Sequence, residues 1–180
     1  MPSLRIHKEN ENLPHFVTIT AIEWLNIFAS KEYFDCIINC LKYCQKNLGL
    51  LIYEYVIMTN HIHLIVQAKE GYELSRIVQS FKQFTTKEIL KIIEVDRREY
   101  ISRILENSFS KRSTNQVWQE TNYPELIESE QFLQQKVSYI HNNPVIKGYV
   151  DEPQYYFYSS ARNRYLDENS IIKLDNDIYK

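Results

Sequence analysis

Apolar side chains recur along the chain with two different periods, and these periods divide its first half into four predicted elements. Residues 15–20 are rich in β-branched side chains and predict a strand. In residues 31–47 apolar positions recur every three or four residues, which predicts an amphipathic helix, and Gly49 follows where a left-handed cap is common. Residues 50–57 and 61–67 predict two more strands, and their short connection predicts an antiparallel hairpin.

The second half of the chain is predicted to be mainly helical. Residues 74–93 have the spacing of a long helix, and residues 94–105 predict a charged helical extension. Residues 116–119 are expected to form a short edge strand. A last helix is predicted from Glu130 and is expected to stop at Pro144, because proline disfavours helical propagation.

The order of these elements is β-α-β-β-α-β followed by a helix. This order is typical of an α+β, ferredoxin-like domain with a central antiparallel sheet. At ~100–200 residues per domain, the 180 residues predict a single domain over 1–180, with its core at about 15–165 and a short C-terminal extension.

Glycine is scarce in this chain, with 3 residues among 180, while tyrosine is abundant, with 14. The three glycines stand apart, so neither a Walker loop nor a Rossmann glycine fingerprint is present. We therefore expect no nucleotide cofactor. The net charge of −2 argues against a globally basic nucleic-acid binder, but residues 71–115 carry nine basic and six acidic side chains. That segment is net +3, so a basic face is predicted on an otherwise acidic protein.

The cysteines and the N-terminal residues bear on the cellular compartment. Cys36, Cys40 and Cys44 fall on one face of a predicted helix, where packing in the core is favoured over a thiolate metal site because no fourth ligand is near. The N-terminal residues lack the apolar core of a signal peptide, and no apolar run reaches the ~18 residues of a membrane span. A reduced, cytoplasmic protein without a membrane partner is expected.

Two histidines on one predicted strand are the first candidates for chemistry. Alternation places His61 and His63 on one face and the aliphatic Ile62, Leu64 and Val66 on the other. Two neighbouring neutral imidazoles provide half of a divalent-metal site. Taken alone, such a pair on a half-exposed strand is more often an ordinary surface feature.

The predicted last helix provides the second group of candidates. Phe132, Lys136, Tyr139 and Asn143 fall along one stripe, next to an apolar stripe that is expected to face the sheet. A tyrosine hydroxyl, an amide oxygen and an ammonium on one stripe are suited to a phosphodiester. The alternative is an amphipathic helix whose tyrosine covers the sheet, and periodicity alone does not single out Tyr139.

With these stretches identified, the sequence resembles the single-tyrosine HUH transposases, and among them the REP-associated tyrosine transposase branch. HUH denotes two histidines around a bulky hydrophobic residue, which matches His61-Ile62-His63. The resemblance covers about residues 15–165. The other matching stretches are Phe16-Val-Thr-Ile-Thr20, Phe81-Lys-Gln-Phe-Thr-Thr86, Val117-Trp118-Gln119, Tyr139-Ile-His-Asn-Asn-Pro-Val-Ile-Lys-Gly-Tyr-Val150 and Tyr158-Ser-Ser-Ala-Arg162.

The resemblance implies an enzyme that nicks and joins single-stranded DNA at hairpin-forming ends. It implies that His61, His63 and Asn143 hold Mg²⁺ or Mn²⁺, and that Tyr139 attacks the scissile phosphate to form a 5′-phosphotyrosine link. Relatives include monomers and dimers, so a homodimer with the tyrosine donated across the interface stays open. A hairpin DNA or RNA binding module that does not cleave is the alternative function.

Six residues are candidates for direct contact with nucleic acid. The basic candidates could meet phosphates, although a solvated lysine is the commoner role at Lys136. The aromatic candidate could stack on an unpaired base. For Phe81 and Phe84, in contrast, a place in the helix core is favoured by their spacing. The six candidates are Lys82, Lys87, Lys111, Arg112, Trp118 and Lys136.

Overall fold

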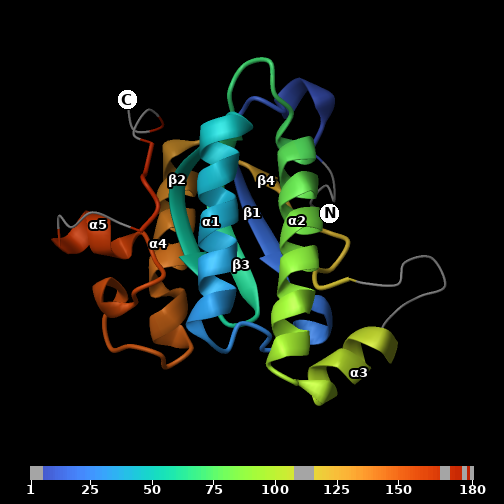
Figure 1. The fold of residues 1–180 in the computed structure, drawn as a ribbon. Coiled ribbons are helices and arrows are strands. Elements are labelled where there is room, and N and C mark those ends of the chain that lie inside the picture. The colour runs from blue at the N-terminus through green and yellow to red at the C-terminus, as the bar shows by residue number, and fades with distance from the viewer. Residues whose placement is uncertain (1–5, 108–115, 167–170, 176–177, 179–180) are drawn as a thin grey trace.

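The computed structural model describes residues 6–107, 116–166, 171–175 and 178. Its centre is an antiparallel sheet of four strands in the order β2-β3-β1-β4, which is the strand order of a ferredoxin-like fold (Figure 1). The predicted fold class is therefore confirmed. The strands are β1 (His15–Thr20), β2 (Leu50–Ile57), β3 (His61–Ala68) and β4 (Glu125–Leu126).

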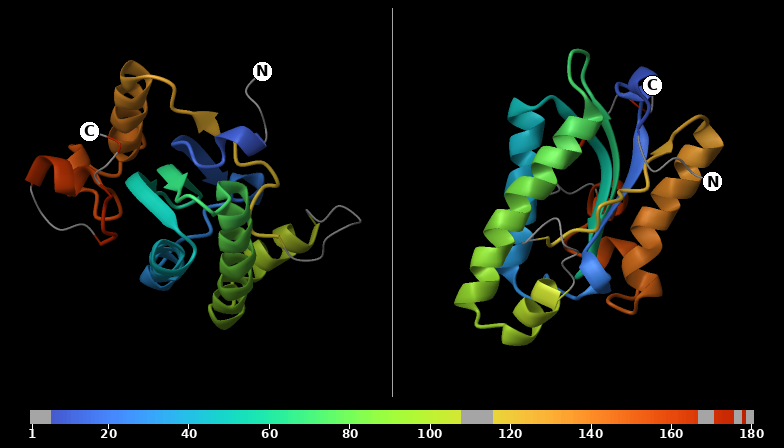
Figure 2. Two further views of the ribbon diagram at one scale, coloured as in Figure 1. Left: turned by 90° about the horizontal axis from the view of Figure 1, so that it is seen from above. Right: turned by 90° about the vertical axis from the view of Figure 1, so that its right-hand side faces the viewer.

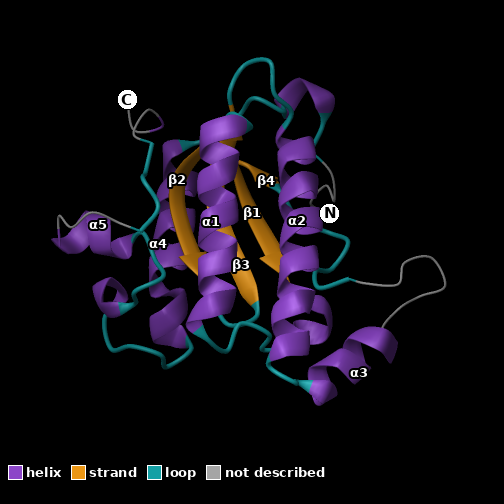
Figure 3. Cartoon of the chain, viewed as in Figure 1, coloured by secondary structure: helices purple, strands orange, loops and turns teal. Residues whose placement is uncertain are grey.

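Helices cover both faces of the sheet. Two long helices lie on one face, and the helix that carries the candidate tyrosine lies on the other, as Figure 2 shows. The short last helix lies outside these layers, beside the edge strand β2 (Figure 3). The helices are α1 (Lys31–Asn47), α2 (Leu74–Val95), α3 (Glu99–Asn107), α4 (Glu130–Ile146) and α5 (Ala161–Leu166).

The alternation of β3 divides the core into two parts. Ile62, Leu64 and Val66 pack in the larger cluster between the sheet and α1 and α2. Ile65, from the opposite face, packs with Ile140 of α4 in the smaller cluster. The histidines share the face of Ile65, so the same alternation that fills the main core directs both imidazoles toward α4.

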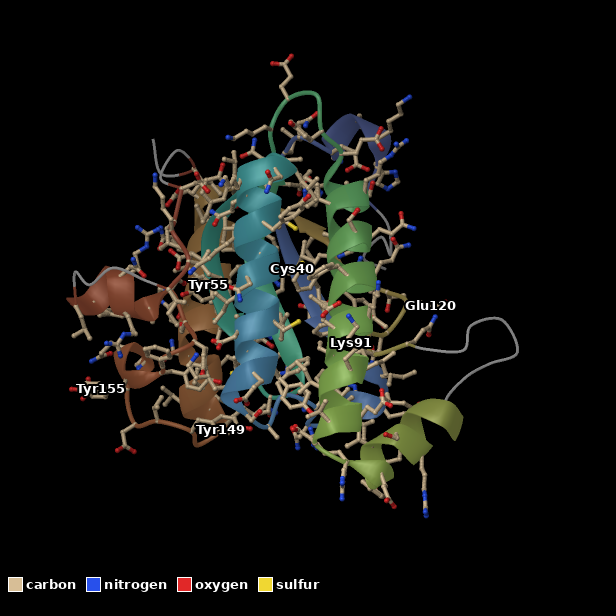
Figure 4. All side chains as sticks on the ribbon, in the orientation of Figure 1. Cys40, Tyr55, Lys91, Glu120, Tyr149 and Tyr155 are labelled. Atoms are coloured by element: carbon tan, nitrogen blue, oxygen red, sulfur yellow. The ribbon has the colours of Figure 1, made fainter. Side chains whose placement is uncertain are left out.

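The three cysteines of α1 lie as the packing interpretation expects. Cys40, labelled in Figure 4, and Cys44 are buried in the main core, and Cys36 is half-buried beside it. Burial and the neighbouring Glu88 raise the pKa of the Cys36 thiol to about 11, so this thiol is protonated at neutral pH. No helix in the described residues is long and apolar enough to cross a membrane.

Three predicted boundaries were wrong, each for a local backbone reason. The fourth strand is not residues 116–119, which make a single bridge between Trp118 and Ala21; the ladder with β1 resumes only at β4. Between them Pro124 has no N–H to donate and Tyr123 has a φ of 42°. Arg97, with a φ of 52°, separates α3 from α2. Pro144 does not end α4, because the amide of Lys147 still bonds to the Asn143 carbonyl at 3.1 Å.

Candidate functional site

β3 and α4 bring the two histidines, Asn143 and Tyr139 together. His61 and His63 are both only 4% exposed, and their ring centroids lie 4.7 Å apart. Asn143 is buried on α4 and faces His61, whereas Tyr139, one turn earlier, keeps 44% of its surface exposed. The four side chains form a group that is buried at the histidines and open to solvent at the tyrosine.

His63 has one ring nitrogen bonded and the other without a partner. Its Nδ1 lies 2.9 Å from the Thr18 hydroxyl on β1, while its Nε2 is buried and meets no hydrogen-bond partner in the described residues. Burial, together with the charges of His61 and Lys136, lowers the pKa of His63 to about 3. At neutral pH the ring is therefore uncharged, which is the form that binds metals.

His61 is oriented by a neighbouring amide. The Asn60 Nδ2 donates to the Trp24 carbonyl at 3.2 Å, so the Asn60 Oδ1, 2.6 Å from His61 Nδ1, accepts the proton of that nitrogen. This leaves a lone pair on His61 Nε2, which lies 3.3 Å from the Asn143 Oδ1. Two acceptors that face each other at this distance would be satisfied by a shared cation.

The electrostatics of His61 agree with a neutral ring. Burial is the main cause that lowers its pKa to about 4, and the charge of Lys147 acts in the same direction while the contact with Asn143 opposes it. Across the described residues, no cluster of three His, Cys, Asp or Glu side chains is placed to hold a metal. The oxygen that lies beside the His61 ring from α4 belongs to the side-chain amide of Asn143.

Tyr139 is held against the histidine pair by aromatic packing. Its ring meets His63 edge-on, with the centroids 5.0 Å apart and the planes at 69°. It also meets Phe16 of β1 edge-on at 6.0 Å, while Phe16 stacks on His63 at 5.4 Å. These contacts hold the Tyr139 ring beside the imidazoles while much of its side chain stays exposed.

A buried polar cluster fastens α4 to β2 between Tyr139 and Asn143. His141 donates from Nε2 to the Glu54 carboxylate at 2.8 Å. Ser160 and Arg164, which follow α4 in the chain, donate to the same carboxylate at 2.5 and 2.7 Å. Glu54 is fully buried, so this cluster fixes α4 both to the sheet and to the segment that returns along β2.

This cluster and the residues that orient the histidines were absent from the sequence interpretation. One signal was available: Glu54 is the only charged residue in the apolar stretch Leu50–Ile57, and a buried carboxylate requires partners. The sequence did not indicate which residues those partners are, because His141 and Arg164 are 87 and 110 residues away from Glu54 in the chain. No sequence signal pointed to Thr18 either, because its contact with His63 depends on the register of β1 against β3.

Two of the nucleic-acid candidates are structural. Trp118 is 2% exposed and donates from Nε1 to the Thr85 hydroxyl at 2.9 Å, so its faces are not available to a base. The Lys82 ammonium donates to the carbonyls of Gln119 and Glu120 and to the Asn122 Oδ1, and it thereby holds the loop beside α2 in which Figure 4 labels Glu120. Burial lowers the pKa of Lys82 to about 8.

The remaining candidates differ in availability. Lys136 bonds to Glu125 at 2.6 Å and lies 4.3 Å from the centre of the Phe16 ring, so its charge is already paired. Lys87 is exposed on α2. Lys111 and Arg112 lie outside the described residues. For the aromatic pair, Phe81 is buried as expected, but Phe84 is 53% exposed and so is not a core residue.

The chain was compared with curated proteins and with solved structures. No curated protein has significant sequence similarity to the chain. A solved REP-associated tyrosine transposase bound to a REP hairpin is similar in fold, with a TM-score of 0.65, 17% identity, and coverage of 98% of this chain and 93% of that one. A candidate transposase from Deinococcus radiodurans R1 matches with a TM-score of 0.46 at 16% identity, over 71% of this chain and 88% of that one.

The sequence profile of one family extends over most of the chain. It is the family described as Transposase IS200 like, and it matches residues 13–143. That range begins just before β1 and ends at Asn143, so it contains both histidines and Tyr139. The chain therefore belongs to the IS200-like transposase family.

Proposed function

We propose that the protein nicks and rejoins single-stranded DNA at hairpin-forming ends through a covalent bond to Tyr139. The observation that carries this proposal is the position of an exposed phenol edge-on to His63, whose Nε2 is buried without a partner. A nucleophile beside an open set of metal donors is the arrangement that phosphoryl transfer requires, because this reaction depends on positioning and on neutralised charge.

The donor set fits a divalent metal. His61 and His63 provide two neutral imidazole nitrogens and Asn143 provides an amide oxygen, while Asn60 and Thr18 contact the opposite ring nitrogens. These outer contacts hold the imidazoles so that each Nε2 points to the site. When bound there, Mg²⁺ or Mn²⁺ would polarise the scissile phosphate and neutralise its charge.

Tyr139 would supply the nucleophilic oxygen. The phenol gives up its proton as its oxygen bonds to phosphorus, the bond from phosphorus to the 3′ oxygen breaks, and that oxygen takes up a proton. The products are a 5′-phosphotyrosine and a 3′ hydroxyl. The tyrosine ester keeps the free energy of the phosphodiester, so rejoining needs no nucleotide hydrolysis, in agreement with the lack of glycine-rich phosphate loops. Because Tyr139 and His63 of the same chain are in contact, the arrangement supports attack within one protomer.

Two observations support the proposed DNA ligand: the ligand of a protein with a similar fold, and the basic residues that remain available for phosphate. The REP-associated transposase was solved with a REP hairpin, and we extend that ligand class to this chain. Lys87, exposed on α2, is the described candidate that remains available for a phosphate. Lys111 and Arg112 are proposed for the same role on the basis of sequence.

The test is covalent capture of a labelled DNA hairpin that has single-stranded flanks, with Mg²⁺ or Mn²⁺ present. We expect an adduct that survives denaturation and that disappears in Tyr139→Phe and in His61→Ala. Tyr155→Phe is the matched control, because Tyr155, labelled in Figure 4, is also exposed but lies after α4 in a separate turn. An adduct that persists in Tyr139→Phe would refute the assigned nucleophile, and binding without any adduct would favour a binding module.

A further inference from the structure

A strongly exposed tryptophan lies beside the histidine pair. Trp24, in the turn after β1, is 57% exposed, and its ring meets His61 edge-on with the centroids 5.8 Å apart. The second tryptophan of the chain, Trp118, is buried in the core. A large apolar ring that stays in water next to the proposed reaction centre is a candidate contact for substrate.

The backbone of this turn is held in a disfavoured conformation. Glu23 and Trp24 have φ values of 51° and 54°, the left-handed region that residues other than glycine rarely occupy. Asn60 donates to the carbonyl of Trp24, and Arg98 holds the segment that follows by donating to the carbonyls of Ile27 at 2.5 Å and Asn26 at 3.0 Å. Strain that the surrounding structure maintains in this way is typical of functional sites.

The same turn forms one wall of a surface groove. The groove has a volume of about 690 Å³ and runs between the Trp24 turn and the junction of α2 and α3. Its other wall carries Tyr100, which is 74% exposed, and Arg97, which is also exposed. Two exposed aromatic rings and a cation therefore line a groove that begins beside His61.

The charge of Arg97 is available to a ligand. Of the neighbouring acids, Asp96 accepts a hydrogen bond from the Tyr33 hydroxyl at 2.9 Å, and Glu99, which also lines the groove, lies 3.8 Å from Arg103. Within residues 6–107 and the other described segments, Arg97 itself forms no salt bridge. The groove thus combines stacking surfaces with an unpaired positive charge, which is the chemistry of single-stranded nucleic-acid binding.

We propose that this groove binds unpaired nucleotides of the strand that carries the scissile phosphate, with bases stacked on Trp24 and Tyr100 and a phosphate at Arg97. The inference rests on the proposed function, because that function places the scissile phosphate at His61 and His63. Asn60 links the two sites physically, since the same amide holds the Trp24 turn and orients the ring of His61. Stacking of this kind tolerates any base, so the groove would position the strand without reading its sequence.

The exposed tryptophan provides the measurement. The Tyr139→Phe variant is used so that the DNA is not cleaved. It is titrated with three ligands while its tryptophan fluorescence is recorded: a blunt DNA hairpin, the same hairpin with single-stranded flanks, and the same hairpin with flanks of abasic sites. Of these three ligands, only the hairpin with base-containing flanks is expected to quench the fluorescence and to bind more tightly. Trp24→Ala should weaken binding of the flanked hairpin roughly tenfold, and Trp24→Phe should keep most of the affinity. Tyr43→Ala is the matched control, since Tyr43 is also 57% exposed but lies on α1.

Specific outcomes would overturn the inference. Equal affinity of Trp24→Ala and the parent chain for the flanked hairpin would refute it, as would equal binding of abasic flanks. Fluorescence that changes with protein concentration in the absence of DNA, together with a dimer in sedimentation, would assign the groove to a second copy of the chain. If the wild-type chain forms no adduct while base-dependent quenching persists, the catalytic proposal fails and the groove assignment stands.

Discussion

Replacement of Glu54 by glutamine tests how the tyrosine helix is held. Glu54 is fully buried and accepts hydrogen bonds from His141, Ser160 and Arg164, and each donor comes from α4 or the segment after it. The variant keeps the shape of the side chain but removes its charge. Removing one member of a buried ionic group costs about 3–5 kcal/mol. Because the Arg164 side chain is 32% exposed and can turn to water, we expect about 3 kcal/mol.

Urea unfolding followed by circular dichroism at pH 7 measures this loss. Since a domain of this kind is stable by only about 5–15 kcal/mol, the variant should stay folded with a clearly lower midpoint. Glu125→Gln is the matched control, because Glu125 also pairs with one cation, Lys136, but is 34% exposed. It should lose no more than about 1 kcal/mol. Equal losses in the two variants, or a loss below about 1 kcal/mol in Glu54→Gln, would refute the anchoring argument.

The stability lost in Glu54→Gln should depend on pH in a defined direction. Burial by itself would raise the pKa of Glu54, but its hydrogen bond with His141 and the charges and hydrogen bonds of the cluster outweigh burial and lower it. A lowered pKa in the folded state stabilises the protein above the ordinary value of 4.5. The difference in unfolding free energy between wild type and Glu54→Gln should therefore be full above that pH and should narrow as the pH falls below it. A difference that grows on acidification would contradict the assignment.

The same variant should also affect the reaction. α4 carries Tyr139 and Asn143 on either side of His141, so a looser attachment moves the nucleophile relative to the histidine pair. A displacement of about 1 Å can cost up to roughly a hundredfold in rate. We expect covalent adduct formation to fall by more than about tenfold in Glu54→Gln, and to change little in Glu125→Gln.

Three further predictions concern residues whose environment only the structure shows. Asn60→Ala should weaken Mn²⁺ binding about 10–100-fold by calorimetry, because His61 loses the acceptor that fixes its tautomer; unchanged affinity would contradict that role. Lys82→Met should lower the unfolding free energy by about 1–3 kcal/mol, since it leaves loop acceptors without a donor, and a wild-type melting curve would disprove this. Lys87→Ala should reduce the slope of DNA affinity against salt by about one, with no change in melting temperature; an unchanged slope would remove it from the interface.

Much of the fold could be predicted because its signals are local. The bounds predicted for β1, α1 and β2 match the structure, because the apolar residues in these segments are largely the ones that the fold buries. The predicted fourth strand was wrong also because the backbone of this segment depends on a distant partner. Lys82 of α2 holds the loop before β4 by donating to the loop's backbone carbonyls. No local sequence pattern shows that this loop interrupts the pairing with β1.

For the site, the sequence by itself determined which side chains share a face. The period of two placed His61 and His63 together, and the period of the helix placed Tyr139 next to Asn143. Only the tertiary structure decided that these two faces meet, that Trp118, Lys82 and Lys136 are occupied within the protein, and that Trp24 stands beside the histidines. The physical reason is that periodicity fixes the direction of a side chain within its own element, whereas its partners are set by how the sheet and the helices pack against each other.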